Sequence, residues 1–217
     1  PGFDHASAVQ AFVARVVDDL LNELAGRTQQ PRILDAGCGT GVWMAFLSAR
    51  ARALGLSPHL YGFDVADRMV ETAQAELAGV TTDVRLRRAD LQDPACCCFD
   101  DGTDTFDFVF AYDVIQQLNR RNQMEAVVRL TEAVAPGGGA VIFDHERWSR
   151  YGIRMGWKKF VTANAGIPMV PRHYCAAAYP PLDRFARRLR PRSGLNATVV
   201  TTGHPAKRAL VLRRTDE

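Results

Sequence analysis

Apolar positions along the chain alternate between the spacing of helices and the continuous runs of buried strands. Residues 7–25 place valine, leucine and phenylalanine on one helical face, and Gly26 follows as a stop. The expected strands lie at 32–35, 59–64, 83–90, 106–113 and 140–144, and the helices between them at 42–54, 66–79 and 124–134. Strands that alternate with helices of this length predict an α/β fold with a doubly wound, mostly parallel sheet.

The C-terminal segment departs from this alternation and predicts an antiparallel edge. Residues 197–202 and 208–214 are two β-rich runs on either side of "GHPAK", which favours a hairpin. The run "PGGG" at 136–139 is expected to separate a helix from the fifth strand. We therefore expect a single domain over 1–217 with a seven-stranded sheet. Its predicted sections are a covering helix at 1–30, a cofactor-binding core at 31–144, an inserted cap at 145–192 and the hairpin at 193–217.

Composition places the chain among ordinary globular proteins, because 47% of its 217 residues are hydrophobic and 24% are charged. No apolar run of about 18 residues indicates a membrane span, and no secretory signal is visible. The five cysteines include Cys96-Cys97-Cys98 but no CxxC pair, which fits neither a disulfide framework nor a zinc site of familiar spacing. We interpret that run as reduced thiols in a partly buried loop and expect a cytoplasmic protein.

A net charge of +3 conceals opposite charges in two parts of the chain. Residues 1–144 carry 12 Lys and Arg against 20 Asp and Glu, whereas residues 145–217 carry 15 against 4. Within 145–192 the balance is 11 against 2, and the basic residues are interleaved with Trp, Tyr and Phe. Such a distribution bears on partners rather than on the fold, and it favours an anionic one.

Three glycines crowd the segment "ILDAGCGTG" at 33–41, directly after the first strand. A dinucleotide fingerprint G-x-G-x-x-G would need its third glycine at position 42, where this chain has Val42. Asp35, two residues before the first glycine, would repel a pyrophosphate and instead suits a cationic or amine-bearing ligand. A tight turn without any ligand is the alternative for a glycine pair alone, but the pattern D-x-G-x-G-x-G is more specific than that.

This segment and four later ones resemble the motifs of class I S-adenosylmethionine-dependent methyltransferases. The later segments are "LYGFDVADRMVETA" (60–73), "RRADLQD" (87–93), "FDFVFAYDVIQQL" (106–118) and "LTEAVAPGGGAVIFD" (130–144). They occur in the order and at the spacing of that family, from Ile33 to Asp144. The resemblance implies a Rossmann-like fold and S-adenosylmethionine as cofactor.

The same resemblance assigns roles to single residues. The glycine loop would lie against the methionine part of the cofactor, with Asp35 near its amino end. Asp64 would hold both ribose hydroxyls, Asp90 the adenine amino group, and Leu91 the adenine ring. A carboxylate can accept two hydroxyl donors, although an Asp after a strand is also a common helix N-cap. The full expected set is Asp35, Ala36, Gly37, Cys38, Gly39, Gly41, Asp64, Val65, Asp90, Leu91 and Ala111.

Candidate catalytic groups follow the fourth and fifth strands, where an acceptor should enter. They are Tyr112, Asp113, Asp144 and His145. We expect His145 to act as general base, with Asp113 and Tyr112 beside it, because histidine titrates near working pH. A histidine that only hydrogen-bonds a loop carbonyl is the equally weighted alternative. We expect no metal, since His145 stands where the metal-assisted hydroxyl methyltransferases have Asn.

The basic cap would close over the acceptor, with Arg147, Trp148, Tyr151 and Arg154 as its predicted substrate-binding residues. The expected reaction moves a methyl group to oxygen or nitrogen of a small anionic acceptor. RNA or another nucleic acid is one alternative acceptor, although "AYDV" after the fourth strand is not the tetrapeptide of enzymes that methylate base amines. A non-catalytic scaffold is a second alternative, and a homodimer is left open. The helix "RFARRLR" in the cap could be a solvated surface helix.

Overall fold

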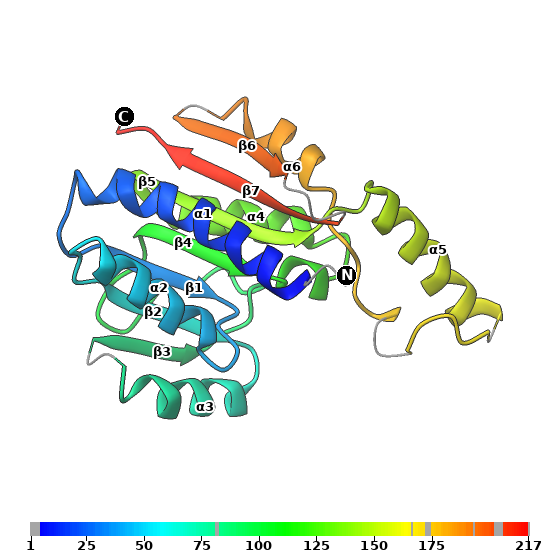
Figure 1. The fold of residues 1–217 in the computed structure, drawn as a ribbon, viewed down its shortest axis with the longest axis horizontal. Helices are drawn as coiled ribbons and strands as arrows, with labels where there is room; N and C mark the ends of the chain where they lie inside the picture. The colour runs from blue at the N-terminus through cyan, green and yellow to red at the C-terminus, as the bar shows by residue number, and fades with distance from the viewer. Residues whose placement is uncertain are drawn as a thin grey trace.

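Seven strands form one sheet in the order β3-β2-β1-β4-β5-β7-β6 (Figure 1). This computed structural model describes residues 5–80, 83–165, 167–171, 175–192, 194–201 and 206–216. The strands are β1 Arg32–Ala36, β2 His59–Asp64, β3 Val84–Arg88, β4 Phe106–Tyr112, β5 Val134–His145, β6 Leu195–Thr201 and β7 Lys207–Arg214. β1 to β5 run parallel, and β7 pairs antiparallel with β5 and β6. The predicted doubly wound sheet with its antiparallel edge hairpin is confirmed, although residues 202–205 of the hairpin turn lie outside the described residues.

Helices cover both faces of this sheet and form a separate core with each. Their bounds are α1 His5–Ala25, α2 Val42–Ala53, α3 Asp67–Leu77, α4 Gln123–Glu132, α5 Arg150–Ala165 and α6 Leu182–Leu189, with a 3₁₀ turn η1 at Ile115–Gln117. On one face α1, α2 and α3 pack their apolar sides against the strands. On the other face α4 and α6 do the same, together with the loop that holds the buried Cys96 and Cys97. Among the helices that the structure describes, none is both long and apolar enough to cross a membrane.

The "PGGG" run does not end the helix before a strand, as expected, but forms part of β5. Phe106 of β4 pairs with Val134, while Phe108 pairs with Gly139, so four residues of β5 lie opposite one residue of β4. A β-carbon on Gly138 would lie 2.7 Å from the carbonyl oxygen of Asp107. Glycine therefore lets this bulge lie close against β4, and the strand begins earlier than its apolar pattern indicates.

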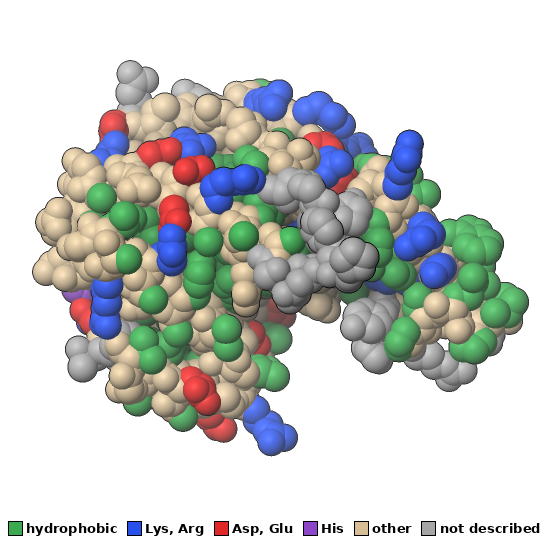
Figure 2. Space-filling model, in the orientation of Figure 1, with side chains coloured by type: hydrophobic (Ala, Val, Ile, Leu, Met, Phe, Trp, Pro, Cys, Tyr) green, Lys and Arg blue, Asp and Glu red, His purple; other side chains and the backbone are tan. Residues whose placement is uncertain are grey.

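The segment predicted as one cap over 145–192 has two parts. α6 buries Leu182, Phe185, Ala186 and Leu189 in the core beside α4 and β6, so it belongs to the body of the domain rather than to a solvated surface. Only α5 stands apart, projecting beyond the carboxyl end of β5 (Figure 1). Basic and hydrophobic side chains gather on this projection (Figure 2). Trp157 and Phe160 on α5 are 60% and 65% exposed.

Candidate active site

The turn between β1 and α2 needs glycine at three positions, whose surroundings differ. Gly37, Gly39 and Gly41 all have positive φ, at 77°, 52° and 83°, which other residues adopt only with strain. A β-carbon on Gly37 would lie 2.5 Å from the Val114 side chain, and one on Gly41 would lie 3.2 Å from that of Ala73. A β-carbon on Gly39 would meet nothing within 4 Å. The turn is therefore packed on two sides and open at Gly39, as a cradle for a ligand must be.

A cavity of about 240 Å³ opens beside this turn, at the carboxyl ends of β1, β2, β3 and β4. Strand order reverses between β1 and β4, which is where doubly wound sheets bind their ligands. The lining residues are Gly37, Phe63, Asp64, Val65, Ala89, Asp90, Leu91, Tyr112, Asp113, Val114, Gln117 and Leu118. Five of them, Gly37, Asp64, Val65, Asp90 and Leu91, are residues that the sequence predicts for the cofactor.

Other predicted cofactor residues do not line this cavity. Ala36 and Ala111 are fully buried in their strands, Cys38 is almost fully buried, and Gly39 and Gly41 belong to the turn without lining the cavity. The sequence prediction missed the wall formed by Val114, Gln117 and Leu118. These residues lie inside the segment 106–118, which resembles a family motif, but the sequence analysis assigned no cofactor contact to them individually.

Asp64 is held at the end of β2 by two backbone groups. Its Oδ2 accepts the N–H of Gly39 and its Oδ1 accepts the N–H of Ala66, each at 3.0 Å. These bonds fix the carboxylate at the cavity wall, and its two oxygens retain lone pairs for further donors. On the neighbouring strand end, Asp90 accepts the N–H of Gln92 at 2.9 Å and Leu91 is buried. A nucleoside with paired hydroxyls and a flat ring fits this donor and acceptor set.

Asp35 is 2% exposed and does not line the cavity. Its Oδ2 has no hydrogen-bond partner among the described residues. Burial, and then the charge of neighbouring Asp64, raises the pKa of Asp35 to about 8. A buried carboxyl oxygen without a donor is suited to a positive group brought by a ligand, directly or through water.

Asp113 directly follows β4 and joins the cavity to a cluster of polar and charged groups. It is a non-glycine residue at φ 59°. Its carboxylate forms an ion pair with the ammonium of Lys207 on β7 and lies 3.4 Å from Nδ1 of His145. Burial opposes ionisation of this carboxyl, but the contacts with His145 and Lys207 outweigh burial and lower the pKa of Asp113 below its ordinary value. Asp113 therefore stays ionised at neutral pH, between a cation and the imidazole.

Asp144 lies beneath this pair and is fully buried. Its oxygens accept the backbone N–H of Gln116 at 2.9 Å and of His145 at 2.7 Å. Burial, and then the charge of Asp113, raises the pKa of Asp144 to about 8. Ligand atoms of Asp113, Asp144 and His145 lie within 4.8 Å of one another, close enough to share a cation. The ammonium of Lys207 already contacts Asp113, so the protein supplies a cation of its own at this cluster.

Aromatic rings enclose the imidazole and the ammonium. The His145 ring stacks on that of Tyr179, with centroids 4.9 Å apart, and lies 6.1 Å from that of Tyr151. Lys207 is 4% exposed at its side chain and lies over the Tyr112 ring, 4.2 Å from its centroid. Burial, and then the charges of Asp113 and Asp144, raises the pKa of Tyr112. Sequence reasoning missed Lys207 and Tyr179 as site residues, although the strand that begins with Lys207 pairs it directly with His145.

Two of the four predicted substrate-binding residues line a cavity, and the other two do not. Arg147 and Trp148 line a second cavity of about 240 Å³, which Tyr179 also lines. Tyr151 lies beside the His145 ring instead, and Arg154 is exposed and lines neither of the two cavities beside α5. The histidine therefore lies between the cavity at the glycine turn and a second cavity lined by the start of the cap.

Comparisons with known proteins agree with this geometry. A family model of a methyltransferase domain matches residues 33–138. The fold is similar to that of an O-methyltransferase family protein from Burkholderia thailandensis, at 17% identity and a TM-score of 0.68, over 95% of this chain and 56% of that protein. It is also similar to magnesium protoporphyrin IX methyltransferase from Synechocystis with bound S-adenosylhomocysteine, at 16% identity and a TM-score of 0.62, over 99% and 90% of the two chains.

A third similar structure is the O-methyltransferase TomG from Streptomyces achromogenes in complex with S-adenosylmethionine, at 20% identity and a TM-score of 0.57, over 93% and 80% of the two chains. The search of curated proteins finds no match. At these identities the solved structures show the fold alone. Together with the methyltransferase domain matched over residues 33–138 and a cavity lined at the predicted positions, they support a class I S-adenosylmethionine-dependent methyltransferase.

Proposed function

We propose that this enzyme transfers a methyl group to an oxygen or nitrogen of a small anionic acceptor, with His145 as general base. One observation carries the proposal. The carboxylate of Asp113 lines the cofactor cavity, its partner His145 stacks on Tyr179, and Tyr179 lines the second cavity. A single half-buried imidazole therefore lies between the two cavities between which a methyl group would pass.

The residues at the first cavity fit S-adenosylmethionine. Asp64 would accept the ribose hydroxyls, Asp90 and Leu91 would hold the adenine, and Asp35 would face the positive amino end beyond the glycine turn. When bound, the cofactor supplies a methyl group already activated by a sulfonium. The protein then has to align the acceptor, exclude water and remove a proton. Tyr112, which lines the cavity and packs on Trp43 at 4.5 Å between ring centroids, would supply a rigid wall at the transfer site.

The pair Asp113–His145 would remove the proton. An ionised carboxylate beside Nδ1 favours the tautomer with its proton on that nitrogen, which makes the other ring nitrogen the basic one that would take a proton from the acceptor. Lys207 would keep Asp113 ionised and would therefore act as a positioning residue. Asp144 holds the backbone N–H of His145 and orients the end of β5. The cluster could also bind a metal ion, but the base mechanism needs none.

Nucleic acid is the second candidate acceptor, favoured by the exposed Trp157 and Phe160 beside the cations of α5. Transfer of a labelled methyl group from S-adenosylmethionine into an extract of the source cells distinguishes the two. We expect label among polar anionic metabolites when the extract is separated into metabolites, lipids, nucleic acid and protein. Label confined to nucleic acid would overturn the small-molecule proposal, and a ribonuclease-treated extract is the matched control.

A further inference from the structure

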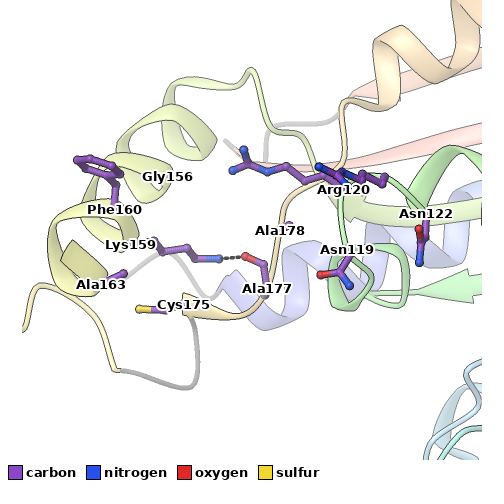
Figure 3. Close-up of a pocket in the computed structure, with 11 residues that line it drawn as sticks. Asn119, Arg120, Asn122, Gly156, Lys159, Phe160, Ala163, Cys175, Ala177 and Ala178 are labelled. Carbon is purple, nitrogen blue, oxygen red and sulfur yellow. Dashed lines mark hydrogen bonds between the residues drawn. The ribbon is translucent and has the colours of Figure 1, made fainter.

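Two adjoining cavities run between α5, the loop at 119–122 and the segment at 175–179, with volumes of about 670 and 240 Å³. They share Arg120, Gly156, Lys159, Ala177 and Ala178, so we treat them as one space, called here the basic groove. In Figure 3 the side chains of α5 border one side of the groove, Asn119 and Arg120 border the other, and Ala177 and Ala178 lie between.

The groove collects positive charge without acidic groups. Arg120, Arg121, Arg147 and Lys159 line it together with two asparagine amides, and none of its described lining residues is Asp or Glu. Several arginines elsewhere form ion pairs with carboxylates, as Arg213 of β7 does with Glu23 of α1. In the part of the chain that the structure describes, no carboxylate forms an ion pair with any of these four residues. An anion that enters would neutralise charges that the fold leaves uncompensated.

The cations are also held close enough to oppose one another. Burial first, and then the charge of Arg120, lowers the pKa of Arg147. Burial lowers the pKa of Lys159; Cys175 and, more weakly, Asp144 oppose this effect, whereas Arg120 adds to it. Arg120 and Arg121 are exposed, whereas Arg147 is half-buried and Lys159 is buried. Like charges that a fold gathers in one place repel one another, and a bound ligand of opposite charge relieves that repulsion. The two less exposed cations therefore favour a binding site in this groove.

Lys159 is anchored at the base of the groove. Its ammonium donates to the carbonyl of Ala177 at 2.7 Å and lies 4.1 Å from the centroid of the Tyr179 ring. The residue is 9% exposed. An ammonium has three N–H donors, so this one bond leaves two for a ligand. An immobilised donor loses little conformational freedom on binding.

The groove reaches the catalytic cluster at one end. Tyr179 lines the smaller cavity and stacks on His145. The chain from Gln117 to Arg120 separates the two sites, because Gln117 and Leu118 line the cofactor cavity while Asn119 and Arg120 line the groove. An acceptor lying along the groove could place one end beside His145 and the other among the cations.

We propose that the basic groove binds a phosphate monoester, or an equivalent dianionic group, at the end of the acceptor remote from the methylated atom, with Arg120, Arg147 and Lys159 as its ligands. The use of this group by an acceptor rests on the function proposed above. Four cations exceed what a single carboxylate would neutralise, and guanidinium groups match the tetrahedral oxygens of phosphate in paired hydrogen bonds.

Titration calorimetry with pyrophosphate tests the site without requiring any methyl transfer. The protein is saturated with S-adenosylhomocysteine, and ionic strength is held constant. We expect Arg120→Gln and Arg147→Gln each to weaken pyrophosphate binding by about tenfold, the usual effect of one charged hydrogen bond. Arg187→Gln, which removes the same charge from the exposed side of α6, should change nothing. Retained affinity for S-adenosylhomocysteine shows that each variant is folded, since neither arginine lines the cofactor cavity.

The outcomes separate the groove from the proposed reaction. Equal pyrophosphate affinity in all four proteins, or no binding by the unaltered protein, would overturn the phosphate site even if methyl transfer to a neutral acceptor were found. Binding that depends on Arg120 would support the site even if no anionic acceptor were methylated. A short single-stranded RNA that binds far more tightly than pyrophosphate, and depends on Arg154 and Lys158 on α5 rather than on Arg120, would replace this proposal with a nucleic-acid surface.

Discussion

Lys207, the first residue of β7, forms an ion pair with Asp113 at the end of β4, two strands away in the sheet. β5 lies between them, and antiparallel pairing places Lys207 directly opposite His145. The edge hairpin therefore does more than cover the sheet, because it brings a buried cation to the carboxylate that contacts the proposed base. The geometry makes Lys207 essential to the charge balance of the site.

Replacing Lys207 should destabilise the protein more than the loss of an exposed ion pair. Lys207→Met leaves Asp113 without its ammonium partner, and we expect the free energy of unfolding to fall by about 3 kcal/mol. Arg213→Met removes the exposed pair with Glu23 and should cost less than about 1 kcal/mol. Urea unfolding at pH 7 measures both values. Equal effects of the two substitutions would show that the Lys207 contact is no stronger than a surface ion pair.

Cofactor binding should depend on Asp64 more strongly than on other acids near the same strand. Asp64→Ala removes the acceptor proposed for the ribose hydroxyls and also the partner of the Gly39 and Ala66 amides. We expect S-adenosylmethionine binding to become undetectable by calorimetry. Asp67→Ala is the matched control, because Asp67 is exposed at the first turn of α3 and does not line the cavity. Unchanged affinity in Asp64→Ala would contradict the assignment of this cavity.

Alanine substitutions at Gly39 and Gly37 should differ in their effects on cofactor affinity and on stability. An alanine at Gly39 meets no neighbour, so beyond the strain of its positive φ it should mainly obstruct the cofactor. An alanine at Gly37 would collide with Val114 and should lower the melting temperature as well. We expect Gly39→Ala to weaken S-adenosylmethionine binding at least about tenfold for a loss of about 1 kcal/mol in stability. A variant at Gly39 that unfolds without losing affinity would show that the turn is only structural.

Local patterns in the sequence predict most of this fold. Apart from β3, which has no buried residue, the first five strands, the helices between them and the edge hairpin have apolar spacing that their burial explains. β5 begins earlier than expected because the glycine run forms a bulge within the strand. This bulge lies against the backbone of Asp107 in β4, and local sequence does not indicate that contact. α5 was not predicted because its apolar residues are largely exposed, so burial imposed no helical pattern on them.

The site was predictable where it consists of short motifs and not where it depends on tertiary pairing. Asp64, Asp90 and Leu91 each follow a strand whose end could be located from the sequence, and all three line the cavity. Lys207 and Tyr179 come from segments more than 30 residues after His145, and only strand register and ring stacking place them beside it. Arg120 was overlooked for the same reason, because it becomes part of the basic groove only when the fold places it opposite α5.

Asp35 should make the stability of the ligand-free protein fall as pH rises. Its pKa is about 8 in the folded protein and near 4 when unfolded, so between these values the folded state binds more protons than the unfolded state. The free energy of unfolding then decreases with increasing pH through that window and levels off above pH 8. Asp144 has the same shift and adds to the slope. Asp35→Asn should make the free energy of unfolding less dependent on pH. At pH 8 we expect this variant to be more stable than the parent protein by more than about 1 kcal/mol, and at pH 4 we expect no such gain.

Denaturant titrations at several pH values test this pH dependence of stability in the parent protein and in Asp35→Asn. The affinity of Asp35→Asn for S-adenosylmethionine should also fall if Asp35 faces the amino end of the cofactor. A slope identical to that of the unsubstituted protein would show that Asp35 is ionised when folded.

His145→Ala should separate chemistry from binding. The imidazole does not line the cofactor cavity, so S-adenosylmethionine affinity should stay within about twofold of the parent value. Loss of a positioned general base lowers turnover by roughly a hundredfold or more. Turnover measured with the identified acceptor, at saturating cofactor, tests this effect. A turnover like that of the parent enzyme would remove His145 from the reaction and leave it as a ring that orders Tyr179 at the end of the basic groove.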